Sequence, residues 1–246
     1  MVTASRTQRA SKKATSKKAT SKKASPGKAN PTRPSAADKR RALWFLDGIT
    51  GRFPDAKIEL DYSDGDAWEL LVAVVLSAQC TDKKVNEATP ALFAAFPDVR
   101  AFARAAPEDV EPLIRTLGLF RSKAKNLVAT ARILVQDFEG RVPTERAVLE
   151  TLPGVGKKSA AVIVSNAFGE PAIAVDTHVA RVTRRMGLHA EENPHKIEDA
   201  LTALLPRERL LDAHHAFIWH GRRICAARKP LCGECPVASR CPRVGV

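Results

Sequence analysis

The sequence predicts a mainly α-helical protein, and three observations support this. Apolar residues recur at helical spacing in one segment after another beyond residue 41, as in "AWELLVAVVLSAQC" and "KSAAVIVSNAF". Alternation typical of strands is scarce, and "AIAV" before Asp176 is the best short extended candidate. Glycines and prolines fall between the helical segments, where helix ends are expected. With 246 residues and 44% hydrophobic content, the chain can bury a substantial core as one large or two small domains.

The predicted helices follow one another along the chain. The first begins after Ser35, which can cap it, and runs to about Thr50. The second begins after Asp66, and Glu69 three residues later gives this start the pattern of a capping box. The remaining helices are predicted at about residues 83–95, 107–117, 122–138, 145–151, 157–168, 177–187, 194–204 and 208–223.

Most of the positive charge lies at the start of the chain. Residues 1–41 hold thirteen Lys and Arg against one acid, so they carry +12 of the formal net charge of +13. "SKKAT" occurs twice and "SKKAS" once between residues 11 and 25, and residues 4–41 contain no aromatic or branched aliphatic side chain that could form a core. We expect residues 1–35 to be a disordered Lys-rich arm that binds nucleic acid by neutralising phosphates. A solubilising extension is the alternative.

The sequence predicts neither export nor membrane insertion. The charged start is not followed by the apolar region of a signal peptide. The longest apolar run, "LLVAVVL" at residues 70–76, is too short to span a bilayer. We therefore expect the chain to work inside the cell.

The stretch "LPGVGKKSA" at residues 152–160 combines two glycines, two lysines and a hydroxyl group, which indicates phosphate binding. A nucleotide P-loop requires a glycine, four further residues and then Gly-Lys-Ser/Thr. Thr151 occupies the position of the first glycine, and Lys158 separates the Gly-Lys pair from the serine, so this interpretation fails on spacing. The pattern instead predicts a tight turn, Pro153–Gly156, between two helices.

Four of the five cysteines lie close together near residue 246, in "CAARKPLCGECPVASRC". They have the spacing C-x6-C-x2-C-x5-C and are Cys225, Cys232, Cys235 and Cys241. Four thiolates within seventeen residues can surround one metal centre, and a metal would then order this short segment. A disulfide pair is disfavoured because the sequence lacks an export signal. The spacing alone leaves zinc and an iron–sulfur cluster equally open.

Taken together, these motifs resemble the endonuclease III family of helix-hairpin-helix DNA glycosylases and abasic-site lyases. The resemblance rests on "LPGVGKKSA", on "AVDTH" at residues 174–178 and on the four-cysteine segment. "LLVAVVLSAQCTD" and "IRTLGLFRSKAKNL" look like earlier helices of the same family, so the match extends in order over residues 40–241. Cys80 departs from the small residue that close relatives often have, and the arm is an addition.

The resemblance implies a two-lobed fold. A six-helix barrel lobe is expected at about residues 60–170, with the helix-hairpin-helix near 145–168. A cluster lobe is expected from 36–59 plus 171–246, with its loop at 225–241. The resemblance also implies a [4Fe-4S] cluster, which favours iron–sulfur over zinc.

The chemistry that the family performs requires a nucleophile for the C1′ carbon of a nucleotide. An amine displaces the base and leaves an imine, which acidifies the 2′ hydrogen and permits β-elimination of the 3′ phosphate. Adjacent helical residues point about 100° apart, so at most one of Lys157 and Lys158 faces a cleft, and the family match selects Lys158. Asp176 precedes a predicted helix, where it can be an N-cap. The resemblance implies that its carboxylate also helps activate the amine and stabilises developing positive charge.

The positions that match the family imply further residues at a DNA interface. The predicted DNA-binding residues are Gln79, Leu119, Gly154, Gly156, Lys157, His178, Arg228 and Lys229. The glycines let backbone N–H groups approach a phosphate. Gln79 and Leu119 would fill the gap that a flipped-out nucleotide leaves. The alternative for Gln79 is a hydrogen bond at a helix end, and the alternative for Leu119 is a place in the hydrophobic core. For His178 the alternative is a structural histidine.

The sequence therefore predicts a monomeric, bifunctional DNA glycosylase and lyase that removes oxidised pyrimidines from duplex DNA in base excision repair. The expected location is the bacterial cytoplasm at the nucleoid, or a nucleus or organelle if the source is eukaryotic. An adenine-mismatch glycosylase is one alternative, but its pattern lacks the catalytic lysine and carries a further carboxyl-terminal domain for which a chain ending at Val246 has no room. A DNA-binding module without catalysis is the other.

Overall fold

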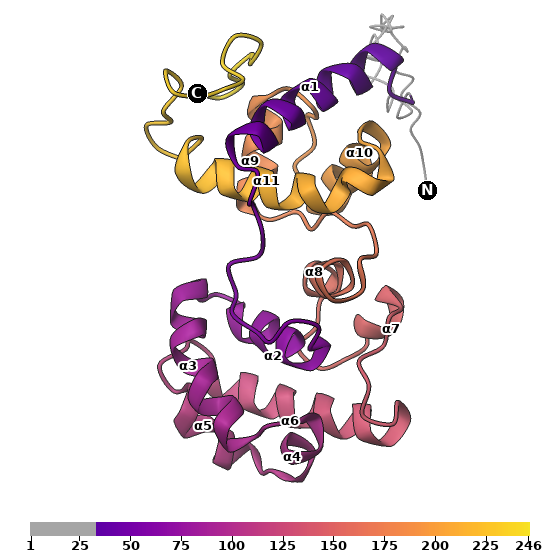
Figure 1. Cartoon of the computed structure of the whole chain (residues 1–246), viewed down its shortest axis with the longest axis vertical. Helices are drawn as coiled ribbons and strands as arrows, with labels where there is room; N and C mark the ends of the chain where they lie inside the picture. Colours follow the sequence, from indigo (N-terminus) through magenta and orange to yellow (C-terminus); the bar gives the residue numbers. More distant parts are fainter. Residues whose placement is uncertain (1–32) are drawn as a thin grey trace, which may run out of the picture. The chain divides into compact units, whose positions relative to one another are not determined.

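The computed structural model describes residues 33–246, so the predicted arm lies outside the described residues except for its last three. Residues 33–246 form α-helices and one 3-10 helix and contain no strand (Figure 1), as the sequence predicts. The elements are α1 (Ala36–Arg52), α2 (Ala67–Ser77), α3 (Asp82–Ala95), α4 (Val99–Arg104), α5 (Pro107–Ile114), α6 (Phe120–Asp137), α7 (Arg146–Leu149), α8 (Lys157–Phe168), α9 (Thr177–Arg185), α10 (Pro194–Leu204), η1 (Arg207–Arg209) and α11 (Leu210–Arg223). Within this part of the chain, every helix is too short or too polar to cross a membrane.

One hydrophobic core lies among helices α2 to α8. Helix α2 is its centre, because eight of its eleven residues are buried and it contacts α3, α6 and α8. Leu127 of α6 and Ile163 of α8 are also fully buried there. This group of helices includes the turn between α7 and α8, so the core holds the beginning of α8 in place.

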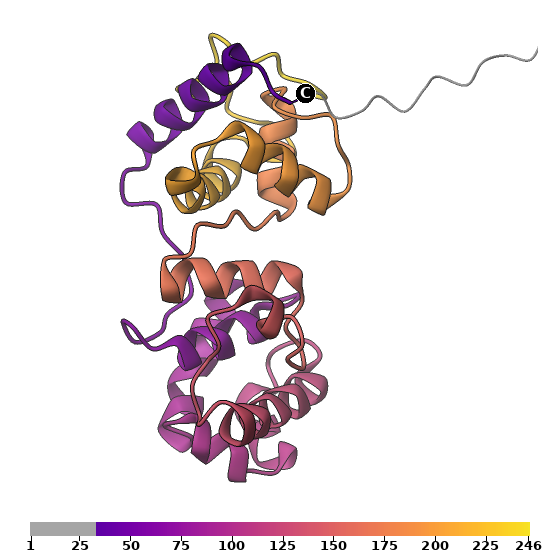
Figure 2. The same cartoon turned by 90° about the vertical axis from the view of Figure 1, so that its right-hand side faces the viewer.

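A second core lies among α1, α9, α10 and α11. Phe45 of α1 and Phe217 of α11 are fully buried in it, together with Val182 of α9 and Leu201 of α10. The chain passes between the two groups of helices at residues 53–66 and 169–176, both without helix or strand (Figure 2). Two separate cores agree with a two-lobed fold, while the exact boundaries of the lobes stay a prediction.

The "AIAV" segment is extended but is not a strand. Ala172 and Ala174 belong to the first core, whereas Ile173 and Val175 belong to the second. The alternation in the sequence therefore arises because an extended crossing segment buries its two faces in two different cores. Its backbone has no neighbouring strand among residues 33–246 to complete a ladder.

The predicted helix starts were largely correct. Ser35 and Asp38 form a complete capping box at α1, and the Asp66 side chain accepts from the Glu69 backbone N–H at 2.9 Å. The capping box expected at Asp66 is wrong in one respect, because the Glu69 carboxylate accepts from the Ser63 N–H at 2.7 Å instead of reaching back to the cap. The sequence reading also missed α4, a helix of only six residues.

Candidate functional site

A cavity of about 340 Å3 lies where side chains from both groups of helices meet. Its lining includes residues at the start of α8, the residue before α9 and one face of α11. Binding pockets for small organic groups usually begin at roughly 300 Å3, so the volume is sufficient for one such group. Of the predicted site residues, Lys158, Asp176 and Gln79 line this cavity.

Lys158 lies in the first turn of α8 and is exposed to the cavity. The helix forms because Gly156 precedes it as the N-cap and because Ala160, Ala161 and Ile163 are buried on its inner face. Lys157 does not line this cavity, and its carbonyl oxygen accepts a hydrogen bond from Arg146 Nη2 at 3.3 Å. This arrangement agrees with the expectation that at most one of the two lysines faces a cleft.

Asp176 caps the N-terminus of α9 and lines the same cavity. Its Oδ1 accepts from the backbone N–H groups of His178 and Val179, both at 2.8 Å. Because both bonds go to one oxygen, the carboxylate is held in a fixed orientation while Oδ2 has no cap contact. The same side chain therefore serves as a helix cap and as a fixed negative charge in the cavity.

Two adjacent histidines of α11 complete this wall of the cavity, and the sequence reading did not identify them. Burial, followed by the charge of His215, lowers the pKa of His214 to about 3, although Asp176 acts in the opposite direction. Burial likewise lowers the pKa of His215 to about 4. Both rings are therefore neutral at pH 7. The signal was the pair of histidines in an otherwise apolar stretch, "AHHAFI".

The hydrogen bonds of the two histidines fix their tautomers. The His214 Nδ1 lies 3.0 Å from the Ala174 carbonyl oxygen, which only accepts, so the proton of the neutral ring is on Nδ1. The His215 Nε2 lies 3.0 Å from Asn166 Oδ1, so His215 donates to α8 through Nε2. These bonds tie α11 to the crossing segment and to the helix that carries Lys158.

Acidification should destabilise the fold through these two histidines. In the unfolded chain each has a pKa near 6.5, so the unfolded state binds more protons between pH 6.5 and about 4. Their contribution is complete above pH 6.5 and is lost as the pH falls toward the folded-state values. We expect His214 and His215 together to lower the free energy of unfolding by about 2–3 kcal/mol between pH 7.0 and pH 5.5, measured by urea denaturation. His220, whose pKa burial also lowers to about 4, adds to the total drop. His215→Gln should reduce the drop by about 1 kcal/mol; an unchanged dependence would contradict the assignment.

The turn before α8 presents free backbone N–H groups. Gly154 has a φ of +81°, and a Cβ there would lie 3.0 Å from Asn126 Nδ2, so both the conformation and the space require glycine. Gly156 has ordinary extended backbone and open space around it. Among the described residues no side chain caps the N-terminus of α8. The first N–H groups of this helix are therefore available to an anion.

Gln79 and Leu119 lie in two loops with similar backbone strain. Both are in the left-handed region, with φ of +56° and +58°. A Cβ on Gly118, beside Leu119, would lie 3.9 Å from the Gln79 carbonyl oxygen, so the two loops are neighbours. Leu119 is 58% exposed, which excludes the alternative that it is a core leucine. A large apolar side chain on a strained loop is typical of a contact site.

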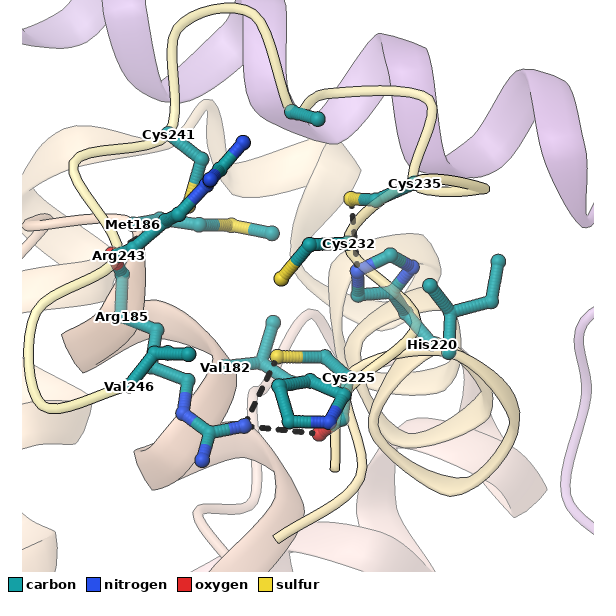
Figure 3. Close-up of a pocket in the computed structure, with 13 residues that line it drawn as sticks. Val182, Arg185, Met186, His220, Cys225, Cys232, Cys235, Cys241, Arg243 and Val246 are labelled. Atoms are coloured by element: carbon teal, nitrogen blue, oxygen red, sulfur yellow. Dashed lines mark hydrogen bonds between the residues drawn. The ribbon is translucent and has the colours of Figure 1, made fainter. Parts of the chain in front are cut away.

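The four clustered cysteines line one pocket, and Figure 3 shows their sulfur atoms around a common space. Burial raises the pKa of Cys235 and Cys241, and negative charge on Cys225 and Cys232 raises both pKa values further. Cys241 adds to the effect on Cys235, so the four groups lie within electrostatic reach of one another. Among residues 33–246, no group of three or more His, Cys, Asp or Glu side chains is placed to hold a single metal ion. A site for four thiolates around a larger centre fits an iron–sulfur cluster better than one zinc ion.

Arg185 of α9 anchors the loop that begins at Cys225. Its guanidinium donates to the carbonyl oxygens of Ala226 at 2.7 Å and Ala227 at 3.0 Å. Its Nη1 also lies 3.4 Å from the Cys225 sulfur (Figure 3). Arg228 and Lys229, which follow directly, are both exposed. The anchored loop therefore presents two cations to the surroundings.

His178 is half-buried, and its Nδ1 lies 3.2 Å from Arg181 Nη2. Because a guanidinium only donates, Nδ1 accepts this bond. The observed partner fits the structural alternative, and a contact to DNA phosphate stays a prediction.

Residues 72–207 match the profile of the HhH-GPD superfamily of base excision DNA repair proteins, which is more than half of the 246-residue chain. The chain is 45% identical over 211 residues to endonuclease III of Synechocystis sp., an alignment that covers 85% of this chain and 95% of that protein. It is 43% identical over 204 residues to endonuclease III of Escherichia coli K12, covering 83% and 96% respectively. The chain belongs to the endonuclease III family.

Solved structures of endonuclease III bound to DNA have the same fold. A trapped endonuclease III–DNA covalent intermediate has a TM-score of 0.78 and 41% identity, covering 83% of this chain and 96% of that one. A non-covalent endonuclease III–DNA complex has a TM-score of 0.79 and 41% identity, covering 83% and 95%. The prediction of a two-lobed helix-hairpin-helix glycosylase fold is thereby confirmed.

Residues 225–241 match the iron–sulfur binding domain of endonuclease III. The match begins at Cys225 and ends at Cys241, the outer two of the four cysteines around the pocket. The predicted iron–sulfur cofactor is thereby confirmed. The assignment of each individual cysteine as a ligand is a proposal.

Proposed function

We propose that this chain excises oxidised pyrimidines from duplex DNA and then cleaves the strand at the resulting abasic site. One observation carries the proposal: Lys158 from α8 and Asp176 from the start of α9 line the same cavity. A primary amine and a carboxylate in one sheltered space are the groups that base displacement through an imine requires. The family and the DNA-bound relatives support the substrate class.

Lys158 is the proposed nucleophile. Its amine attacks the C1′ carbon of a flipped-out nucleotide, the bond to the base breaks, and the base leaves with the electron pair of that bond and takes up one proton from the nitrogen. The sugar ring then opens to an imine between Lys158 Nζ and C1′, and the ring oxygen takes the second proton of the nitrogen. Water removes the 2′ proton, a carbon–carbon double bond forms, the 3′ phosphate leaves with the electron pair of its bond to carbon, and a second water hydrolyses the imine and releases the lysine. Each step moves protons and electron pairs within substrate, lysine and water.

Asp176 is the proposed electrostatic partner of this reaction. Positive charge develops on the sugar as the bond to the base loosens, and a carboxylate fixed by two backbone N–H groups can stabilise it without reorganising. Neutral His214 and His215 add no competing positive charge beside Lys158. This wall of the cavity therefore favours the positive charge that develops on the sugar.

DNA is proposed to bind through the free N-terminus of α8 and through the exposed loops. The N–H groups of the first turn of α8, after Gly156, together with the adjacent Lys157, position a backbone phosphate without reading sequence. Gln79 and Leu119 fill the gap in the duplex when the damaged nucleotide enters the cavity. Arg228 and Lys229 contact a further phosphate.

Cys225, Cys232, Cys235 and Cys241 are proposed to hold the [4Fe-4S] cluster. When bound, the cluster cross-links four points of the chain and so orders the loop that carries Arg228 and Lys229. The cluster thus contributes to the proposed reaction by shaping this DNA-binding loop.

A set of duplexes that each contain one defined lesion tests the function. We expect strand cleavage at oxidised pyrimidines and at abasic sites, and little cleavage of undamaged duplex. Excision of adenine opposite an oxidised guanine without strand cleavage would favour the adenine-mismatch alternative. Binding of every duplex without turnover would favour a DNA-binding module.

The arm is proposed to lie along DNA. Deleting residues 1–34 removes ten Lys and Arg and no acid. If about five of these cations contact phosphates, the slope of log affinity against log salt should fall by about 4 to 5 units, at ~0.9 per contact. Single-turnover excision at saturating enzyme should change little, because the proposed chemistry lies in residues 33–246. An unchanged slope would favour the solubilising alternative.

We propose a bacterial location, with the protein associated with the nucleoid. The relatives named above are bacterial proteins, and a basic arm of this kind suits a cytoplasmic DNA partner.

A further inference from the structure

Arg146, the first residue of α7, joins the two groups of helices by an ion pair. Its guanidinium makes a two-bond contact with Glu198 of α10: Nη1 donates to Oε1, and Nη2 donates to Oε2 at 3.2 Å. Helix α7 packs in the first core through Leu149, whereas α10 packs in the second through Ile197 and Leu201. The pair therefore crosses between the two cores.

The same guanidinium also holds the backbone beside the proposed nucleophile. Nη2 donates to the carbonyl oxygen of Lys157 at 3.3 Å, and Nε donates to Glu150 at 3.2 Å. One planar group thus fixes α7, α10 and the peptide that links Lys157 to Lys158. A lysine in this position has a single ammonium group and cannot reproduce the fork.

The environment makes this contact stronger than an ordinary surface pair. The Arg146 side chain is 31% exposed and that of Glu198 only 19%. The hydrogen bonds that Arg146 donates to Glu198 raise the pKa of Arg146 above its ordinary value, with smaller contributions from Glu150. By contrast, the exposed pair Arg207–Glu170 has side chains that are 70% and 53% exposed. Pairs of that kind contribute little to stability or placement.

The location of the ion pair between Arg146 and Glu198 matters because the two proposed reacting groups come from different cores. Lys158 belongs to α8, which packs in the first core, and Asp176 caps α9, which packs in the second. Their separation depends on contacts that cross between the cores. Misplacement of a reacting group by about 1 Å can slow a reaction about 100-fold.

We propose that Arg146 and Glu198 are positioning residues that hold Lys158 in register with Asp176 for the excision step. The proposal rests on the proposed function and adds two residues to it. They act chiefly on the rate of the chemical step, through the placement of Lys158, and their own side chains are not among the proposed DNA contacts. Neither side chain lines the cavity that is proposed to receive the nucleotide.

Single-turnover excision of an oxidised pyrimidine, with enzyme in excess, tests this proposal. Arg146→Gln and Glu198→Gln should each slow excision about 10- to 100-fold, while the Kd for lesion-containing duplex changes less than about 3-fold. Because both substitutions break one contact, the double variant should be no slower than the slower single variant. Arg146→Lys retains the charge and should recover part of the rate. Glu170→Gln, which breaks the exposed pair, should leave the rate unchanged.

Melting temperatures are measured for every variant, and rates are measured well below the lowest of them. Should Arg146→Gln fail to fold, Glu198→Gln, which keeps the shape of the side chain, decides the question alone. Wild-type rates for the variants, additive effects in the double variant, or a loss confined to DNA affinity would overturn the proposal. A wild-type protein without excision activity would instead count against the proposed function.

Discussion

Replacing Lys158 with glutamine should abolish excision and strand cleavage. An amide of similar length lacks the nucleophilic lone pair of an amine, so it cannot attack C1′ or form the imine. Removal of a nucleophile typically lowers the catalytic rate by several orders of magnitude, and we expect a loss of at least about 1,000-fold. Single-turnover cleavage of a duplex with one oxidised pyrimidine measures this.

DNA binding by the Lys158→Gln variant should persist, because the proposed phosphate contacts come from backbone N–H groups and other cations. Lys157→Gln is the matched control, since it changes a neighbouring lysine of the same helix turn that contributes its carbonyl oxygen to Arg146. It should weaken binding modestly and leave the chemical step intact. Loss of excision in Lys157→Gln with normal excision in Lys158→Gln would reverse the assignment.

Replacing Cys232 or Cys235 with serine should remove the cofactor and disorder the chain from about residue 225 onward. The wild-type protein should be yellow-brown and contain about four iron atoms per chain, as a cubane cluster requires. The loop between Cys225 and Cys241 has few other anchors, chiefly Val237, which is fully buried, and the Arg185 contacts. Iron analysis, the visible absorption spectrum and melting temperature measure the effect.

Cys80→Ala is the control for the cluster variants. The Cys80 sulfur lies 3.1 Å from the buried Lys123 Nζ in the first group of helices, whereas the other four cysteines belong to the second group. Its iron content should equal that of the wild type. Stoichiometric zinc without iron in protein prepared anaerobically would contradict the cofactor.

The fold was predictable where a helix is long and strongly patterned. Helices α6 and α8 were found within two residues of their ends, because each has an apolar face and clear boundary residues. Helix α2 was found at its start, but it ends at Ser77, three residues before the end of the predicted segment "AWELLVAVVLSAQC". Helix α4 was missed because its six residues contain only two buried side chains, Val99 and Phe102, too few to show a period.

The site was predictable only in part. Spacing alone did not choose between Lys157 and Lys158, and the family match made that choice. The only local signal for His214 and His215 was the pair of histidines itself, because their partners Ala174 and Asn166 are 40 and 49 residues away in the chain. Arg146 and Glu198 are 52 residues apart for the same reason. Contacts between the two cores are set by the tertiary fold, and a local pattern does not encode them.

The most direct measurement is the location of the covalent adduct. Borohydride added during reaction with an abasic or oxidised-pyrimidine duplex should reduce the imine and leave the DNA fragment attached to the protein. Nuclease digestion, proteolysis and mass spectrometry then identify the modified residue. The remnant should be found on Lys158. An adduct on Lys157 or elsewhere, or no adduct while the strand is still cleaved, would contradict a mechanism through Lys158.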